Sequence, residues 1–258
     1  MSGILFEKNG AIGKITLNRP TVYNSFNREM ALAMQEALLD CEKDNAIRAI
    51  YITGEGKAFC AGQDLQEVVD PNGPALTTIL QEHYNPIVLL IRRIEKPIIC
   101  AVNGVAAGAG ANIALACDIT VAHENVSFIQ AFSKIGLIPD SGGTFFLPRL
   151  IGMQKAMALS MLGEKVSAAD AEAMGMIYKT LTAETFETDS WKLAVTLSQM
   201  PTKGLGYTKR AFNLSLTNNL EDQLKLEDEL QTASGETYDY KEGVQAFLEK
   251  RKPEFKGE

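Results

Sequence analysis

The sequence predicts an α/β protein in which a core of alternating strands and helices is followed by an all-helical C-terminal region. Runs rich in β-branched residues alternate with helical patterns up to Gly142, whereas helical spacing dominates after it. The 258 residues, 46% of them hydrophobic, are enough for one large core or two small ones, and no linker-like stretch divides the chain. We therefore expect a core over residues 1–195 and a helical region over residues 196–258, whose helices pack on that core or on a neighbouring subunit.

The first half begins with a predicted β-hairpin, because residues 4–7 and 11–17 flank the strong turn dipeptide Asn9-Gly10. Asn27 is a suitable N-cap for a helix that ends near Lys43. The elements expected after it are a strand at 47–53, a loop at 54–62, a helix at 75–94, a strand at 98–102, a Gly/Ala-rich run at 104–117, and strands at 118–121 and 126–129.

The second half is predicted to be helical, with one further strand at residues 177–181. The expected helices span residues 154–162, 168–174, 188–199, 203–216, 220–232 and 240–250.

The overall charge and hydropathy exclude two classes of protein. A formal net charge of -7 argues against non-specific nucleic-acid binding, which depends on clustered Lys and Arg. No apolar run approaches the roughly 18 residues of a membrane helix, and the N-terminus does not resemble a secretory signal. We expect a cytoplasmic protein that binds neither membrane nor nucleic acid.

The cysteines favour the same compartment. Cys41, Cys60, Cys100 and Cys117 are scattered, without a CxxC pair or a histidine at zinc-finger spacing. They are expected to be reduced structural thiols, so the sequence predicts no metal site.

Two strand–loop–helix junctions, at residues 51–65 and 100–112, are candidates for binding an anion. In each, a strand ends in small residues and a helix follows, so backbone N–H groups and a partial positive charge face the loop. Two junctions directed at one point would supply two donors for an oxygen that becomes anionic during a reaction. The alternative is that the Gly/Ala run only permits close helix–strand packing.

Asp140 is the candidate general base. It follows an apolar segment that ends in Pro139 and precedes two glycines, so its carboxylate is expected in an apolar pocket. The alternative is an N-cap for a helix that begins near Gly142.

These segments resemble the crotonase (enoyl-CoA hydratase/isomerase) family over nearly the whole chain. The resemblance implies a spiral of ββα units, a C-terminal helical trimerisation region and a homotrimer or a hexamer of two trimers. It also implies an acyl-CoA thioester as the substrate, with no metal and no cofactor, since coenzyme A is part of the substrate. The matching stretches are residues 15–20, 57–65, 96–104, 116–118, 136–139 and 242–251.

Family roles carry over to individual residues of this chain. The backbone N–H groups of Ala61 and Ala109 would form the oxyanion hole, with Asn112 as a supporting polar group. Phe247 and Lys250 would reach a CoA bound to the same or a neighbouring subunit. The full set of matched CoA-contacting positions is Val22, Tyr23, Ala61, Gly62, Gln63, Asp64, Leu65, Phe247 and Lys250.

The departures from the family pattern indicate the reaction. Hydratases of the family use two glutamates, but the corresponding residues here are Asn112 and Phe132, which cannot act as bases. A carboxylate stands instead at Asp140, where the hydratase pattern has a glycine. One carboxylate with an oxyanion hole suffices to move a proton from one carbon to another, which is isomerisation.

Within the family, residues 136–144 are most similar to isomerases that convert ring-1,2-epoxyphenylacetyl-CoA to oxepin-CoA in phenylacetate catabolism. The resemblance also allows a double-bond shift in dehydroadipyl-CoA. The alternatives are a Δ3,Δ2-enoyl-CoA isomerase of fatty-acid oxidation, an enoyl-CoA hydratase, a dehalogenase and a non-catalytic or RNA-binding member of the family.

Overall fold

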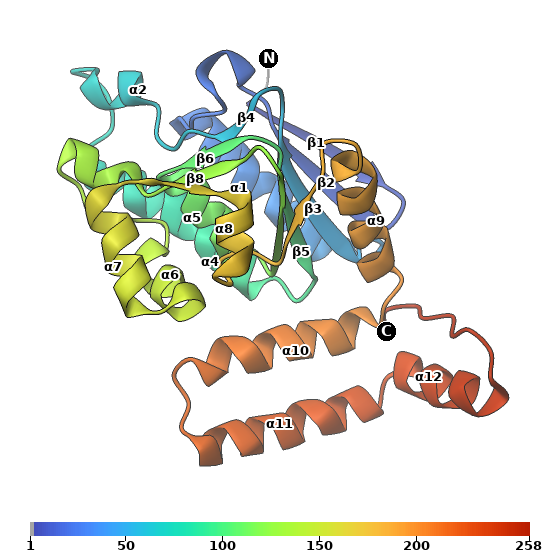
Figure 1. Ribbon diagram of the computed structural model, residues 1–258. Coiled ribbons are helices and arrows are strands. Elements are labelled where there is room, and N and C mark those ends of the chain that lie inside the picture. The colour runs from blue at the N-terminus through green and yellow to red at the C-terminus, as the bar shows by residue number, and fades with distance from the viewer. Residues whose placement is uncertain (1–2) are drawn as a thin grey trace.

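The computed structural model describes residues 3–258 and contains two β-sheets surrounded by helices (Figure 1). The larger sheet has six strands, and all neighbours except β1 and β2 run parallel. In pairing order the strands are β1 (Ile4–Asn9), β2 (Ile12–Leu17), β3 (Ala49–Gly54), β5 (Ile98–Val102), β7 (Ile119–His123) and β10 (Lys179–Leu181).

The smaller sheet explains how the chain forms a spiral. Each of its first three strands follows one strand of the larger sheet, so β3, β5 and β7 lead into β4, β6 and β8, and helices come next each time. The expected fold class, a spiral of ββα units, is therefore confirmed. The four strands are β4 (Ala58–Cys60), β6 (Val105–Ala107), β8 (Ser127–Ile129) and β9 (Lys165–Ser167).

The N-terminal predictions are confirmed. β1 and β2 form the hairpin, with Asn9 opposite Ile12 and Gly10 at φ 60° in the turn. Helix α1 (Arg28–Lys43) starts at Asn27, whose side-chain oxygen accepts from the N–H of Met30 at 3.0 Å.

The helix expected at residues 75–94 is divided into three segments. They are α3 (Leu76–Thr78), a π-helical turn η2 (Ile79–Tyr84) and α4 (Asn85–Arg93). Pro86 has no N–H to donate to the carbonyl of Glu82, and the wider turn leaves that carbonyl free. The amide of Gln35 in α1 donates to it at 2.7 Å. The proline within the helical pattern was the signal for this irregularity.

Both faces of the larger sheet are buried. On one face, alternate strand residues such as Ile12, Tyr51 and Ile99 pack against α9 (Phe186–Ser198), and Tyr51 meets Trp191 edge to face at 5.3 Å. The other face packs in the main core with α1, α4 and α5 (Ala109–Ala116). The remaining elements are η1 (Pro20–Val22), α2 (Leu65–Val69), η3 (Ala131–Ile135), α6 (Gly143–Ile151), α7 (Met153–Leu162) and α8 (Ala168–Ala173).

The C-terminal helices project from the core (Figure 1). They are α10 (Thr202–Ser215), α11 (Leu220–Gly235) and α12 (Tyr238–Glu249). The buried Lys209 of α10 ties them to the core, because its Nζ lies 2.8 Å from Oδ2 of Asp118. The boundary expected between residues 195 and 196 falls in the last turn of α9 and stays a prediction.

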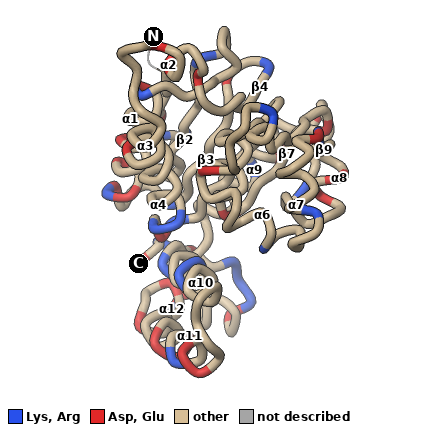
Figure 2. Tube along the Cα trace, turned by 90° about the vertical axis from the view of Figure 1, so that its left-hand side faces the viewer, with Lys and Arg blue, Asp and Glu red and all other residues tan. Residues whose placement is uncertain are grey.

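The surface carries charges of both signs. Figure 2 shows acidic and basic positions interspersed over α10, α11 and α12. Among residues 3–258, no helix is both long enough and apolar enough to cross a membrane.

Candidate active site

The two predicted junctions meet in the structure. β4 and β6 are parallel neighbours, so their carboxyl ends and the loops that follow lie at the same edge. A Cβ built on Gly62, which has φ 93°, would lie 3.1 Å from the carbonyl oxygen of Ala107 and 3.5 Å from the nitrogen of Ala109. A Cβ on Gly110 would lie 2.6 Å from Cys60. Close packing therefore requires these glycines, as the alternative interpretation expected, and it also brings the two loops together.

The expected donor Ala61 is wrong for the first junction. Its N–H already donates to the carbonyl oxygen of Tyr23 at 3.0 Å, so it cannot also serve an oxyanion. Two residues later, Gln63 forms a parallel β-bridge with Phe26. The N–H of Phe26 donates to the carbonyl of Gly62 at 2.7 Å, and the N–H of Asp64 donates to the carbonyl of Phe26 at 2.8 Å. The N–H of Gln63 consequently points away from Phe26.

Two N–H groups remain available at the meeting point of the junctions. Within residues 3–258, the N–H groups of Gln63 and Ala109 have no hydrogen-bond acceptor. Ala109 is the first residue of α5, whose amino end carries a partial positive charge. The resemblance therefore placed one donor of this pair, Ala61, two residues before Gln63, whereas it named Ala109 correctly as a residue with a free N–H.

Asp140 lies between η3 and α6 with its carboxylate largely buried. Burial raises the pKa of Asp140 to about 6, although the Ser141 hydroxyl and the residue's own backbone N–H oppose the shift. The Ser141 Oγ donates to Oδ1 of Asp140 at 2.9 Å. Asp140 does not cap α6 with its side chain, because the N-cap is Gly142 and no side chain caps that end.

Asn112 holds the loop that carries Asp140. This fully buried side chain of α5 donates from Nδ2 to the Asp140 carbonyl at 2.8 Å and accepts at Oδ1 from Nε2 of Gln130, also at 2.8 Å. A Cβ on Gly143 would lie 2.3 Å from Asn112 Nδ2, so the loop rests directly on this amide. The sequence indicated Asn112 as a supporting group but not its partner Gln130.

Phe132 occupies the second of the two positions that the resemblance matches to a hydratase glutamate. Its ring would lie 3.7 Å from a Cβ on Gly108, next to Ala109. The side chain is 6% exposed and cannot ionise. The two positions thus hold an amide and a phenyl ring beside the paired N–H groups.

Tyr84 contacts the first junction, and the sequence did not single it out. Its hydroxyl donates to Oε1 of Gln63 at 2.8 Å, and its ring meets Phe26 edge to face at 5.8 Å. Burial first, then the nearby Cys60 thiol, and after it the charges of Asp140 and other acids, hold the pKa of Tyr84 well above its usual range. The π-helical turn η2 ends at this residue and directs it inward.

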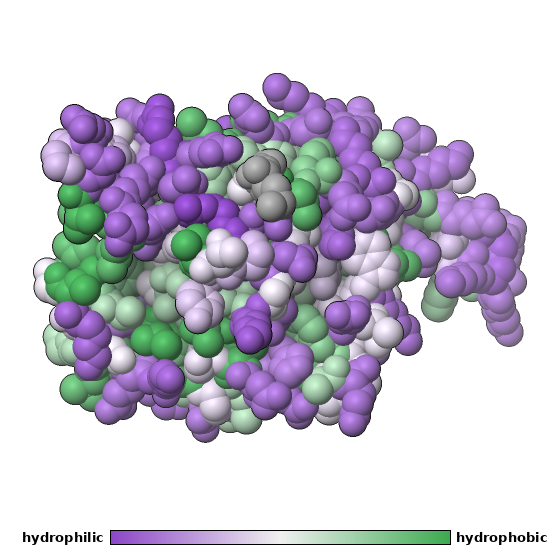
Figure 3. Space-filling view, turned by 90° about the horizontal axis from the view of Figure 1, so that it is seen from above, coloured by the Kyte–Doolittle hydropathy of each residue, from purple (hydrophilic) through white to green (hydrophobic). Residues whose placement is uncertain are grey.

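An apolar cavity of about 430 Å³ is lined in part by the residues that flank Asp140 in the sequence. Pro139 and Gly143, on either side of the aspartate, contribute to its wall together with Leu147, Met157 and Met161. Methionine side chains adapt to ligands of irregular shape. Figure 3 shows hydrophobic side chains gathered on the side of the molecule where α2 and α7 lie in Figure 1.

The matched CoA-contacting residues of the N-terminal half surround the first junction. Val22, Tyr23 and Leu65 expose apolar side chains there. The Asp64 carboxylate is engaged in the fold, since it pairs with Arg19 at 2.9 Å and caps α2 by accepting from the N–H of Gln66.

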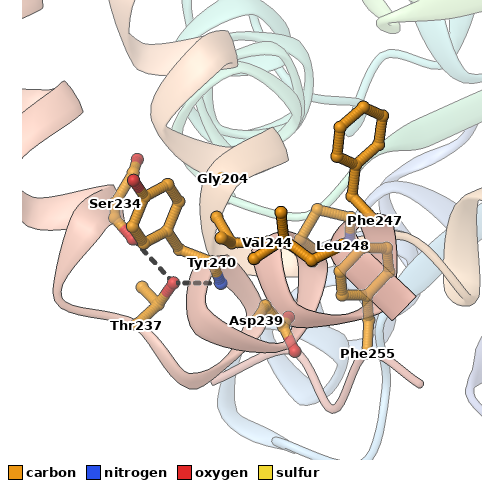
Figure 4. A pocket seen from close by; sticks show the side chains of 11 residues that line it. Gly204, Ser234, Thr237, Asp239, Tyr240, Val244, Phe247, Leu248 and Phe255 are labelled. Atoms are coloured by element: carbon orange, nitrogen blue, oxygen red, sulfur yellow. Dashed lines mark hydrogen bonds between the residues drawn. The ribbon is translucent and has the colours of Figure 1, made fainter. Parts of the chain in front are cut away.

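Phe247 and Lys250 lie elsewhere. Figure 1 places α12 at the opposite end of the molecule from α2, so one chain does not bring these residues to the junctions. Phe247 is 83% exposed, and Lys250 ends α12 with φ 55°. A second cavity of about 430 Å³ lies beside them, with Tyr240, Val244 and Leu248 of α12 along one wall (Figure 4).

In residues 3–258, no cluster of His, Cys, Asp and Glu side chains is suited to hold a metal ion. All four cysteines are buried and unpaired. A reaction without metal or cofactor stays a prediction.

The chain belongs to the enoyl-CoA hydratase/isomerase family. The model of this family, described as enoyl-CoA hydratase/isomerase, matches residues 7–258. The family prediction is therefore confirmed.

Among the relatives, 1,2-epoxyphenylacetyl-CoA isomerase of Escherichia coli (strain K12) is 48% identical over 260 residues, covering 100% of this chain and 99% of its own. A protein of Rhodobacter capsulatus named probable enoyl-CoA hydratase is 43% identical and covers 98% of each chain. The crystal structure of an enoyl-CoA hydratase from Polaromonas sp. JS666 superposes with a TM-score of 0.91 at 34% identity, covering 98% of this chain and 99% of its own.

Proposed function

We propose that the protein is an acyl-CoA isomerase in which Asp140 moves a proton between two carbons of the substrate. The observation that carries the proposal is one buried carboxylate, its pKa raised to about 6, in a site that lacks both hydratase glutamates. A base with a pKa near the operating pH can both accept a proton and return it. The side chains at the two glutamate positions, Asn112 and Phe132, have no carboxylate with which to activate water.

The N–H groups of Gln63 and Ala109 are the proposed oxyanion hole. Asp140 removes a proton from the carbon next to the thioester carbonyl, and the charge passes to the thioester oxygen, where the two N–H groups stabilise it. For the epoxide substrate, the carbon–carbon bond shared by the three- and six-membered rings breaks, its electrons pass into the new double bonds of the seven-membered oxepin ring, and the same carboxyl returns the proton to a carbon further along the conjugated system. Substrate and product are isomers, so the step needs no further reactant. Losing one such donor typically costs about 3 kcal/mol of transition-state stabilisation.

The proposed substrate is ring-1,2-epoxyphenylacetyl-CoA, converted to oxepin-CoA in phenylacetate catabolism. The full-length relative at 48% identity, a 1,2-epoxyphenylacetyl-CoA isomerase, supports it. The apolar cavity lined in part by the residues that flank Asp140 has a volume suited to a ring-sized acyl group. A double-bond shift in dehydroadipyl-CoA would use the same carboxylate.

The proposed assembly is a homotrimer, or a hexamer of two trimers, in the cytoplasm, where the buried thiols remain reduced. Phe247 and Lys250 would then reach the CoA of a neighbouring subunit. Their exposure on α12, far from the junctions of their own chain, supports this arrangement (Figure 1).

The test is a panel of three CoA thioesters with wild-type enzyme and the Asp140→Asn variant. We expect turnover of ring-1,2-epoxyphenylacetyl-CoA, no hydration of 2-butenoyl-CoA, and at least a hundredfold lower kcat in the variant, about the low end for a lost general base. Preference for an aliphatic 3-enoyl-CoA would instead indicate a Δ3,Δ2-enoyl-CoA isomerase. Full activity of Asp140→Asn would remove Asp140 from the mechanism.

A further inference from the structure

Ser141, which follows the proposed base, has an unusual backbone. Its φ of 50° lies in the left-handed region, which non-glycine residues rarely adopt. Gly142 follows at φ 78°, so two successive residues are left-handed. Ser141 is 2% exposed, and a glycine at this position would adopt the conformation without strain. Strain at a buried polar residue next to a reactive group calls for a functional explanation.

The conformation places the Ser141 hydroxyl beside the preceding carboxylate. Its Oγ donates to Oδ1 of Asp140 at 2.9 Å, an interaction between adjacent residues that an extended backbone would not favour. The main chain of the loop is fixed separately, since the Asp140 carbonyl accepts from Gly143 N–H and from Asn112 Nδ2, both at 2.8 Å. The hydroxyl of Ser141 therefore acts on the carboxylate itself.

The two carboxylate oxygens are unequal as a result. Oδ1 accepts from Ser141, whereas no side chain in residues 3–258 donates to Oδ2. An oxygen that accepts from a side-chain hydroxyl is less basic than one without such a donor, and it is held in place. A base that takes a proton at one carbon and returns it at another must present the same oxygen to both positions.

We propose that Ser141 is a positioning residue that fixes the Asp140 carboxylate and leaves Oδ2 to carry the proton. The inference rests on the proposed function, because it assumes that Asp140 is the base. The strained backbone is maintained because it brings the hydroxyl to Oδ1.

The groups around Asp140 determine how pH reports on this role. α5 contributes the neutral amide of Asn112, and α6 begins with the glycine Gly143. From η2, the Tyr84 hydroxyl is the titratable group whose pKa is affected by the charge of Asp140, and burial keeps it protonated far above neutral pH. The acid limb of the activity profile therefore reports Asp140, whose ionised form the Ser141 hydroxyl stabilises.

The experiment compares Ser141→Gly, Ser141→Ala and the control Ser198→Ala. Ser198 is also buried and donates from its hydroxyl, but to a carbonyl within α9, remote from the site. We would measure kcat and KM for ring-1,2-epoxyphenylacetyl-CoA between pH 5 and pH 9, and the thermal midpoint. If that substrate is inert, 3-hexenoyl-CoA replaces it.

Both Ser141 variants should lose about tenfold or more in kcat with KM within twofold, the scale of one hydrogen bond to a charged group. Their acid limb should move to higher pH by at least half a unit, whereas a merely structural serine would lower the whole profile without moving the limb. Ser141→Gly should fold at least as stably as wild type, so it decides the question if Ser141→Ala fails to fold. The control should match wild type.

Wild-type kcat and an unmoved acid limb in Ser141→Gly would overturn the role of Ser141, while an inactive Asp140→Asn would leave the proposed function standing. An active Asp140→Asn would overturn both.

Discussion

Asp140→Asn should make the protein more stable at neutral pH while it abolishes turnover. Burial raises the pKa of Asp140 from its usual 3.8 to about 6, which means that the fold disfavours the ionised form. Such a group is protonated in both states at low pH. As the pH rises, the unfolded chain ionises first, so wild-type stability falls between about pH 4 and pH 6. Asparagine has no such titration.

The size of the stability difference between wild type and Asp140→Asn follows from the two pKa values of Asp140. Each pH unit between these values changes the free energy of unfolding by about 1.4 kcal/mol, so the difference is at most about 3 kcal/mol. The carboxylate keeps partial contact with solvent, so we expect about 2 kcal/mol. Urea unfolding of both proteins at pH 4, 5, 6 and 7, at one protein concentration, measures the difference.

We predict that the difference in free energy of unfolding between Asp140→Asn and wild type grows with pH and levels off above pH 6. The control is Asp228→Asn, which changes an exposed carboxylate of α11 and is taken through the same measurements. A pH-independent difference between wild type and Asp140→Asn would refute the claim that burial tunes this carboxylate. The kinetic assignment of the base would then lose its physical support.

Three further variants test the scaffold around the site. Ala109→Pro removes one proposed donor N–H at a position where helices tolerate proline, so kcat should fall about a hundredfold or more with the fold intact by circular dichroism. Asn112→Leu leaves the Gln130 amide without its partner and frees the Asp140 loop; we expect about 2 kcal/mol less stability in urea and at least tenfold lower kcat. Lys209→Met removes a buried partner of Asp118, and about 1–3 kcal/mol of stability should be lost with kcat of the folded enzyme within twofold. An unchanged unfolding midpoint for Lys209→Met, or unchanged kcat for either of the other two, would contradict these assignments.

Local signals in the sequence were sufficient for much of the fold. Asn27 caps α1 as expected, and the Asn9-Gly10 turn sets the β1–β2 register, because both effects act over a few residues. The π-helical turn at Ile79–Tyr84 was missed because a helical pattern does not reveal which carbonyls a distant side chain satisfies. Here the Gln35 amide, 47 positions from Glu82, accommodates the irregularity that Pro86 introduces.

The proposed oxyanion donors illustrate the same limit at the site. Sequence reasoning identified both junctions but assigned Ala61 as a donor. Which N–H stays free depends on pairing with a segment about 40 residues earlier: the Tyr23 carbonyl takes the N–H of Ala61, and the bridge at Phe26 turns Gln63 outward. Composition and spacing cannot distinguish adjacent amides in a loop, because these long-range bonds set the direction of each.

On the proposed function, the position of the carboxylate would separate this chain from a hydratase on the same scaffold. Asn112 cannot activate water, but its amide holds the Asp140 carbonyl and so supports the loop that carries the proposed base. Gly143 belongs to the same contact, since any Cβ there would collide with that amide. A Gly-to-Asp change at residue 140 of a hydratase should therefore not by itself produce an isomerase, because a glutamate at position 112 would offer no donor to the carbonyl of residue 140. The proposed base needs the amide that holds its loop.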